Sequence, residues 1–261
     1  MQGCNPSLCA KTVIIHLISK LAIMNFHFLR KRKVFTGKVT FECNFQSMQE
    51  VKDKFHITDN EFYNEHEVFF TEDMVTAENG LKIKCIKETG TRTTWQRTGI
   101  YYWRTGCLKT RDKTGGFTQS GGTWVVDAIF PGTWAALWLL HRDYFVSKIG
   151  KNHIIPEIDF AECNQKKINN VVHYGYDKNR YSTKGKLRHV HKPDGKLHQY
   201  AVEILPRGYN FYCDGYISAK FRSNDPEFVS NEPKYLIINN AVGIGLQEES
   251  VFFIKSVKVY E

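Results

Sequence analysis

The sequence predicts an all-β fold, either a sandwich, a jelly roll or a barrel of short strands. From about Val34 onward, short alternating runs follow one another between turn signals, with almost no helical periodicity. Dipeptides of the kind that close tight turns occur at Asn79-Gly80 and Asp214-Gly215. Aromatic residues, which suit β-strands, make up 14% of the chain. Many short strands at this spacing are typical of folds built from stacked or closed sheets.

The turn signals place the individual strands in chain order. Alternation after Asn79-Gly80 predicts one strand, and Pro193-Asp194-Gly195 marks the turn before another. Asp214-Gly215, between two short apolar runs, predicts a two-residue type I′ hairpin. A loop rich in His, Arg and Lys is expected over 141–156. The expected strands cover residues 81–86, 132–140, 157–162, 198–205, 210–213, 216–218, 234–242 and 251–260.

The chain of 261 residues is long enough to bury one large core, and no repeat, low-complexity run or linker divides it. We therefore expect an N-terminal extension, residues 1–33, and one domain, residues 34–261. Within the extension, residues 11–29 are moderately apolar, but Lys20 and His16 interrupt them. This segment can be a degenerate export signal, an anchor, or translated sequence upstream of a true start at Met24.

The charge balance is basic, with 36 Lys and Arg against 27 Asp and Glu, a net charge of +9. Four of these charges lie in the run Arg30-Lys31-Arg32-Lys33. Such a run can bind nucleic acid or an anionic membrane. A solvated tail is the simpler interpretation, because no nucleic-acid-binding motif accompanies it, and we expect no nucleic-acid partner. A basic surface would also tolerate a sulfated or carboxylated polysaccharide.

The seven cysteines are odd in number and include no CxxC pair. Neither a complete disulfide framework nor a metal site is therefore indicated. Cys163 directly follows an acidic residue, but without a plausible base partner it is expected to be a packed apolar residue.

Three carboxylates lie within the six residues Glu157-Ile158-Asp159-Phe160-Ala161-Glu162. On a β-strand Glu157 and Asp159 share one face, whereas strict alternation would turn Glu162 away. One extra residue bulged out near Phe160-Ala161 would bring Glu162 to the same face. Two carboxyl groups about 5 Å apart suit a retaining glycosidase, and a third between them can hold the pair in different protonation states. The plain alternative is a solvated acidic strand edge.

Alternation over residues 132–140 places Trp134, Ala136 and Trp138 on one face of the expected strand, and Ala135, Leu137 and Leu139 on the other. Two tryptophans on one face form either a stack within the core or a platform for sugar rings.

An ordered set of motifs resembles glycoside hydrolase family 16, in its laminarinase/agarase-like branch with a bulged E-x-D-x-x-E strand. The set is GGTWVVDAIFPGTWAALWLL, PEIDFAE, VVHYG, YAVEILPRGYNFYCDG, YLIINNAVG and FFIKSVKVYE. It covers roughly residues 35–261. The resemblance implies a concanavalin A-like β-jelly roll of two curved antiparallel sheets with a substrate cleft on the concave face.

The resemblance also implies roles for individual residues. Glu157 would be the nucleophile, Asp159 the assisting carboxylate and Glu162 the acid/base. Trp134 and Trp138 would line the cleft and bind substrate, and His173 of the HYG triplet would lie near the carboxylates. Two departures, WAALW for the pattern W-P-A-F-W and AVGI for AVGG, are expected to lie by the cleft and to affect substrate preference.

The expected function is endo-acting, retaining hydrolysis of internal β-1,3 or β-1,4 bonds in a glucan or galactan. The alternatives are a non-catalytic lectin-like protein and a transglycosylase with the same covalent intermediate. No cofactor is required for this chemistry. Some relatives bind a structural calcium ion, but no ligand set for calcium is evident here. A polymer substrate implies a secreted or cell-surface protein, although no clear signal peptide is present, and a monomer is expected.

Overall fold

The computed structural model describes residues 32–63, 68–95, 97–141, 156–164, 166–177, 182–226, 228–242 and 248–261. The chain divides into two compact units, Met1–Val34 and Phe35–Glu261. Nearly all of the first unit lies outside the described residues, so the proposed extension and its apolar segment stay predictions. No helix in the described part of the chain has the length and apolar composition needed to cross a bilayer.

The larger sheet of the second unit has eleven strands, and in its described residues one pairing, β4 with β7, is parallel whereas the others are antiparallel. The order is β18 (Tyr216–Arg222), β17 (Gly208–Cys213), β16 (His198–Leu205), β11 (Gly122–Ile129), β20 (Ser250–Tyr260), β6 (Leu81–Thr93), β7 (Thr98–Thr105), β4 (Val68–Phe70) and β3 (Glu61–Phe62), with β1 (Val39–Cys43) on β20 and β5 (Val75–Ala77) on β6.

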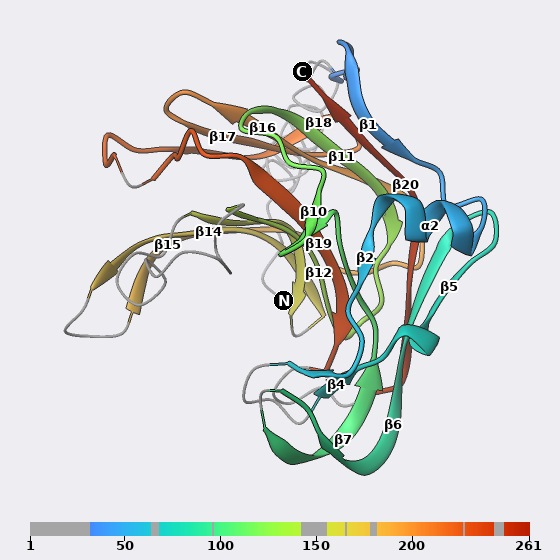
Figure 1. Cartoon of the computed structure of the whole chain (residues 1–261). Helices are drawn as coiled ribbons and strands as arrows, with labels where there is room; N and C mark the ends of the chain where they lie inside the picture. The colour runs from blue at the N-terminus through green and yellow to red at the C-terminus, as the bar shows by residue number, and fades with distance from the viewer. Residues whose placement is uncertain are drawn as a thin grey trace, which may run out of the picture. The chain divides into compact units, whose positions relative to one another are not determined.

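The smaller sheet has seven antiparallel strands, and part of it lies below β16, β17 and β18 of the larger sheet in Figure 1. Its order is β15 (Ser182–His191), β14 (Lys167–Asp177), β13 (Glu157–Asn164), β12 (Trp134–His141), β19 (Lys234–Ala241), β8 (Cys107–Lys109) and β2 (His56–Ile57). The chain changes sheet on either side of β2, of β8 and of β19, and also between β11 and β12 and between β15 and β16. Two stacked, mainly antiparallel sheets with such crossings make a jelly roll, as the resemblance to family 16 implies. A separate two-stranded ribbon joins β9 (Arg111–Asp112) to β10 (Gly115–Gly116).

The main core fills the space between the two sheets. Trp124 and Val126 of β11 meet residues of β12 there, and all of them are fully buried. Each large apolar side chain removed from water in this way contributes about 1.5–3 kcal/mol. The residues that β12 directs into this core are Ala135, Leu137 and Leu139. The predicted alternation of this strand is therefore confirmed, and its other face is turned away from the core.

The predicted hairpin is confirmed at Asp214-Gly215, where both residues have positive φ, 53° and 80°. A type I′ turn requires this left-handed backbone at both central positions, and Asp and Gly adopt it most readily. The hairpin joins β17 to β18. Predicted strands at 198–205, 234–242 and 251–260 match β16, β19 and β20 to within one residue at each end. The predicted strand at 81–86 forms the first half of the longer β6.

One helix, α2 (Met48–Lys54), was not expected from periodicity. The hydroxyl of Ser47 accepts the backbone N–H of Glu50, and the Glu50 carboxylate accepts the backbone N–H of Gln46 at 2.7 Å. This is a variant of the capping box, and Ser followed three residues later by Glu is a sequence signature of it. A single turn, η1 (Glu72–Met74), follows later.

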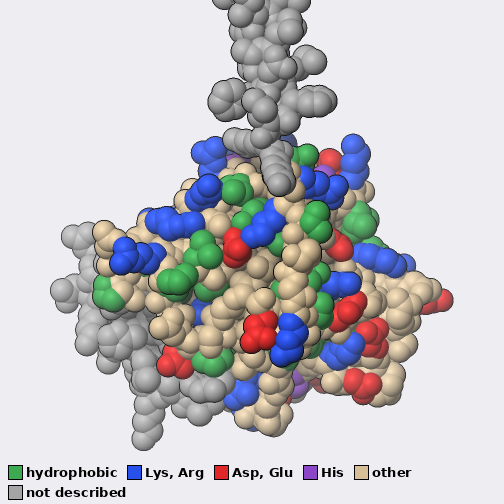
Figure 2. Space-filling view, turned by 90° about the horizontal axis from the view of Figure 1, so that it is seen from above, with side chains coloured by type: hydrophobic (Ala, Val, Ile, Leu, Met, Phe, Trp, Pro, Cys, Tyr) green, Lys and Arg blue, Asp and Glu red, His purple; other side chains and the backbone are tan. Residues whose placement is uncertain are grey.

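The described cysteines are free thiols: Cys43, Cys85, Cys107, Cys163 and Cys213. Cys163 lies fully buried in the main core, as expected for a packed apolar residue, and burial raises the pKa of its thiol to about 12. The predicted basic loop over 141–156 lies outside the described residues except at its two ends. On the side of β16, β17 and β18, Lys and Arg side chains are spread among acidic ones (Figure 2).

Candidate active site

A bulge in β13 brings the three carboxylates to one face of the smaller sheet. Asp159 pairs with Val171 on β14 and Glu162 with Asn169. Between these two pairs β13 advances by three residues and β14 by only two, so β13 has one extra residue. On the other side, Ala161 and Asp159 oppose consecutive residues of β12. This is the bulge that the sequence predicts.

The extra residue of the bulge is accommodated by the core. Phe160 and Ala161 are consecutive, yet both are fully buried in the main core. Two neighbouring residues on the core side reset the alternation by one, so that Glu162 returns to the face of Glu157. We call the side of β13 that carries Glu157, Asp159 and Glu162 the carboxylate face.

Asn170, which the sequence analysis did not single out, holds the bulge from the neighbouring strand. Its side-chain N–H donates to the carbonyl of Phe160 at 2.7 Å, and its side-chain oxygen accepts from the Ser218 hydroxyl at 2.7 Å. Asn170 is almost fully buried. A carbonyl that a bulge removes from the ladder needs such a partner. The Asn169-Asn170 pair just before the VVHYG motif was the signal available in the sequence.

Asp159 forms an ion pair with His173 across the carboxylate face, with 3.4 Å between Asp159 Oδ2 and His173 Nε2. Asp159 is buried, whereas His173 is partly exposed. Hydrogen bonding to Asp159 raises the pKa of His173 to about 9, so the imidazole is a cation at neutral pH. Burial raises the pKa of Asp159 above its usual range, and the bond to His173 opposes that rise. The register also pairs His173 directly with Glu157.

The two glutamates have raised pKa values for shared reasons. Burial first, and then the nearby charge of Asp159, raise the pKa of Glu157 to about 8, while the His173 cation lowers it. Burial and Asp159 likewise raise the pKa of Glu162. Carboxylates this close titrate as a group, so protons are shared among them near neutral pH. Raised pKa values in partly exposed carboxylates are typical of acid/base chemistry.

Trp134 interacts directly with Glu162. Its indole Nε1–H donates to Glu162 Oε1 at 2.7 Å, and this bond lowers the pKa of Glu162 against the effect of burial. Because an indole N–H only donates, Oε1 is held as an acceptor and a proton on Glu162 belongs on Oε2. The Trp134 side chain is half-buried, and its ring meets Tyr63 edge-on at 5.7 Å between centroids.

Trp138 lies further along β12, opposite Asp159. Its indole N–H donates to the side-chain oxygen of Asn239 at 2.8 Å. The ring is half-buried and packs, with Tyr63, against a second apolar cluster that includes Leu140 and Ile237. Neither tryptophan belongs to the main core between the sheets. The structure thus excludes the stack within the main core and leaves both rings beside the carboxylates.

Tyr63 is a second residue of this region, after Asn170, that the sequence analysis missed. It follows β3 and contacts Trp134, and burial together with the charge of Glu157 raises its pKa. A lone Tyr just after a short strand and far from the carboxylate motif carried no signal.

Glu157, Asp159 and His173 also offer ligand atoms that lie within 4.8 Å of one another. Two carboxylates and an imidazole could hold a divalent cation. Without a metal, the charges of these three groups already offset one another in part, because the His173 cation faces the two carboxylates.

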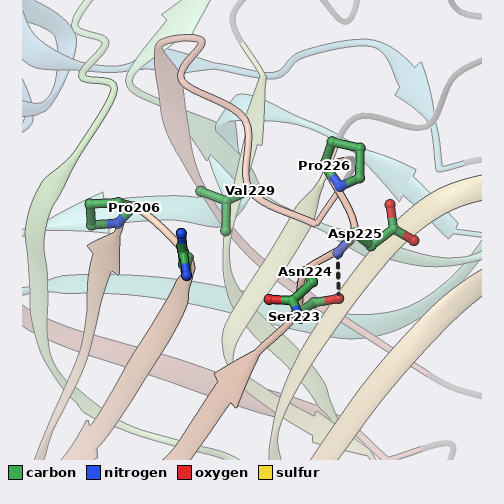
Figure 3. A pocket seen from close by; sticks show the side chains of 7 residues that line it. Pro206, Ser223, Asn224, Asp225, Pro226 and Val229 are labelled. Carbon is green, nitrogen blue, oxygen red and sulfur yellow. Dashed lines mark hydrogen bonds between the residues drawn. The ribbon is translucent and has the colours of Figure 1, made fainter.

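A hollow of about 330 Å³ lies elsewhere on the molecule, and its lining includes none of the carboxylate-face residues. Figure 3 shows its walls, and the one hydrogen bond drawn there runs from the Asp225 backbone N–H to Ser223 Oγ, at 3.1 Å. The labelled lining residues are Pro206, Ser223, Asn224, Asp225, Pro226 and Val229.

No family model matches this sequence, and no curated protein sequence matches it significantly. Solved structures match over most of the chain. The laminarinase catalytic domain of Thermotoga maritima has a TM-score of 0.69 at 19% identity, over 87% of this chain and 99% of that one. The endo-β-1,3-glucanase of Pyrococcus furiosus has a TM-score of 0.68 at 20% identity, over 86% and 94%. SCLam, a non-specific endo-β-1,3(4)-glucanase from family GH16, has a TM-score of 0.69 at 21% identity, over 89% and 94%.

The chain has the fold of the family 16 glucanases. At about 20% identity this likeness establishes the fold, and the chemistry has to be argued from the side chains.

One expectation about the departures from the family 16 pattern is wrong. Ala135 and Leu137 stand where that pattern has Pro and Phe, and they were expected beside the cleft. Both are fully buried in the core between the sheets. Their side chains alternate away from the carboxylate face, so these two changes alter core packing. The last residues of AVGI, Gly243 and Ile244, lie outside the described residues.

Proposed function

We propose that this protein is an endo-acting, retaining glycoside hydrolase of the family 16 type, which cleaves internal β-1,3 or β-1,4 bonds of a glucan or galactan. The observation that carries the proposal is the bulge in β13, which gathers Glu157, Asp159 and Glu162 on one face. A solvated acidic edge would need no bulge, no buried Asp159 and no indole bonded to Glu162. The family 16 fold supports the same conclusion.

In the first step, Glu162 would protonate the glycosidic oxygen from Oε2 while Glu157 attacks the anomeric carbon. Trp134 fixes the orientation of Glu162 through Oε1. The bond to the leaving group breaks, its oxygen takes the proton, and the sugar becomes bound to Glu157 as an ester. In the second step, Glu162 takes a proton from water, and the resulting hydroxide equivalent releases the sugar with retained configuration.

The Asp159–His173 pair would set the protonation states that this sequence needs. Glu157 must be ionised to attack, and the His173 cation lowers its pKa. Glu162 must begin protonated, and the negative charge of Asp159 raises its pKa. Each member of the pair acts in the same direction on both glutamates, because Asp159 raises and His173 lowers the pKa of Glu157 and of Glu162. The pair would thus keep a proton shared among the carboxylates near neutral pH, so that one glutamate can be ionised while the other is protonated.

A β-1,3-glucan is the first substrate to test, because solved structures of the same fold are described as laminarinases and endo-β-1,3-glucanases. A sugar acceptor in place of water would make the same intermediate a transglycosylase. The surface charge leaves room for an anionic galactan. Action on a polymer implies a secreted or cell-surface protein, which remains a prediction.

The test is Glu157→Ser combined with azide. Wild-type protein should release reducing ends from laminarin, and the first product should have the β configuration by NMR. In Glu157→Ser the turnover should fall by at least about 10⁴-fold, while oligosaccharide binding stays within roughly tenfold, because the loss falls on the transition state. Azide, entering the space left by the carboxylate, should restore cleavage of an activated aryl glycoside and yield an α-glycosyl azide.

The matched control is Glu78→Ser, at an exposed glutamate outside β13, which should leave turnover unchanged. If the wild-type protein binds a β-glycan, releases no reducing ends from any glucan or galactan, and shows no effect of Glu157→Ser, the protein is a lectin.

A further inference from the structure

A second group of chemically active side chains lies where the two sheets meet, away from β13. His191 ends β15 of the smaller sheet, and His198 begins β16 of the larger one. Cys213 ends β17, beside Tyr200 of β16. We call His191, His198 and Cys213 the His–Cys cluster. Their side chains are all half-buried, and one ligand atom from each lies within 4.8 Å of the others.

We propose that the His–Cys cluster is a binding site for a divalent, borderline-soft metal ion of the zinc type, and that the ion links the two sheets. Imidazole nitrogen and thiolate sulfur are the donors that zinc prefers, at about 2.0–2.3 Å from the ion. Ligand atoms around such an ion are closer than 4.8 Å, so the three side chains must move together by about 1 Å. Half-buried side chains at the rim of a core can make such a movement.

His191 already has the tautomer that a ligand needs. Its Nδ1 lies 2.7 Å from the carbonyl of Lys192, which can only accept, so Nδ1 carries the proton. In the neutral ring Nε2 then has the free electron pair, and it accepts a hydrogen bond from the hydroxyl of Tyr200 at 3.0 Å. A ring N–H held by a backbone carbonyl is the usual support for a metal-binding histidine. The metal would replace the Tyr200 hydroxyl at Nε2.

Two carboxylates supply the negative charge that a dication requires. His198 Nδ1 lies 2.7 Å from Asp214 Oδ2, and its Nε2 lies 3.1 Å from Asp194 Oδ1. Cys213 Sγ lies 4.0 Å from the same Asp214 oxygen. When the metal binds, one ring nitrogen of His198 and the sulfur of Cys213 each lose a proton to solvent. The second ring nitrogen of His198 keeps its carboxylate partner, and water completes a tetrahedral shell.

The competing interpretation is that His198 is a cation that joins two turns and binds nothing. Its two carboxylates raise its pKa, although burial lowers it, and Asp194 and Asp214 belong to separate turns. That interpretation needs neither His191 nor Cys213. The two accounts therefore differ in what removal of Cys213 does.

The experiment uses the full chain, stripped with a chelator and titrated with Co²⁺ and then Zn²⁺. A sulfur-to-cobalt charge-transfer band in the near ultraviolet should appear at one equivalent and disappear when Zn²⁺ is added. Cys213→Ser should abolish the band, and His191→Asn should weaken Zn²⁺ binding at least ~10-fold. The matched control is His189→Asn, at an exposed histidine two residues from His191 on the same strand, which should change neither.

Zn²⁺ should also raise the melting temperature of the wild-type protein and not that of Cys213→Ser, provided that circular dichroism shows the variant to be folded. Absence of a thiolate band in the wild type, or a band that persists in Cys213→Ser, would overturn the proposal. Hydrolysis is measured in parallel, and loss of the metal should leave it unchanged, so this site and the carboxylate face succeed or fail separately.

Discussion

The carboxylate face and the His–Cys cluster gather charged groups in opposite ways. On the carboxylate face three acids share one cation, His173, and burial raises the pKa of each acid. Around the His–Cys cluster one imidazole, His198, has two carboxylates of its own at hydrogen-bond distance, at the more exposed rim of the sheets. The first region buries three acids against one cation, whereas the second sets its two carboxylates against His198 and Lys196.

The difference indicates where this fold concentrates reactivity and where it gains stability. Crowded, buried carboxylates destabilise the folded state, and the same crowding creates the protonation states that catalysis needs. A balanced and partly solvated cluster contributes little strain and is suited to joining elements. Three substitutions test this contrast, from the largest expected effect to the smallest.

Glu162→Gln should have the largest effect, because it removes the proposed proton donor and keeps the shape of the side chain. Turnover of polymer should fall about 10²–10⁴-fold, the usual contribution of general acid/base catalysis. An aryl glycoside with a good leaving group needs no proton, so formation of its glycosyl-enzyme should be nearly unaffected in burst kinetics. An equal loss on both substrates would contradict the role given to Glu162.

Glu157→Gln should stabilise the protein at alkaline pH. The pKa of Glu157 is about 8 in the folded protein, above the usual value of 4.5, so the folded state binds this proton more tightly than the unfolded chain does. Wild-type stability should therefore fall as the pH rises from about 4.5 through 8. The variant lacks this titration, and its advantage in free energy of unfolding should grow over that window to the order of 2–4 kcal/mol.

Denaturant unfolding at pH 5 and pH 8.5 measures this effect. The matched control, Glu78→Gln, changes an exposed glutamate and should show no difference between the two pH values. If Glu157→Gln is less stable than wild type at pH 8.5, the carboxylate face is not the strained region that the comparison requires.

Trp134→Phe should have the smallest effect and the most specific one. The variant keeps an aromatic ring but loses the N–H that donates to Glu162 Oε1. That bond stabilises the ionised form, so its loss should move the alkaline limb of the pH–activity profile upward and lower turnover by roughly tenfold. Trp138→Phe is the control, because the Trp138 N–H donates to Asn239 and not to a carboxylate. A shift of the limb in both variants would mean that the effect is one of general packing.

The residue patterns by themselves were enough to predict an all-β fold of short strands, the Asp214-Gly215 hairpin and the bulge in β13, whereas the arrangement in two curved sheets was implied by the resemblance to family 16. These features depend on residues that are close together in the chain. Alternation predicts the strands, a turn dipeptide predicts the hairpin, and three carboxylates spaced as E-x-D-x-x-E can share one face of a strand only if one residue is bulged out. The sequence also placed Trp134 and Trp138 together on one face of their strand, because strand period alone decides that. Whether that face belongs to the core was left open, and the structure turns it away from the main core.

Only the tertiary structure decided which groups act on one another. Trp134 donating to Glu162, Asn170 holding the Phe160 carbonyl, and His173 paired with Asp159 all join different strands. The resemblance to family 16 predicts that the departures at Ala135 and Leu137 lie beside the cleft, whereas the structure buries both side chains in the core. His191, His198 and Cys213 come from three strands and two sheets, so no spacing in the chain marks them. Contacts within a strand follow from a local period, whereas contacts between strands depend on the register and on the stacking of the sheets, which the whole chain determines together.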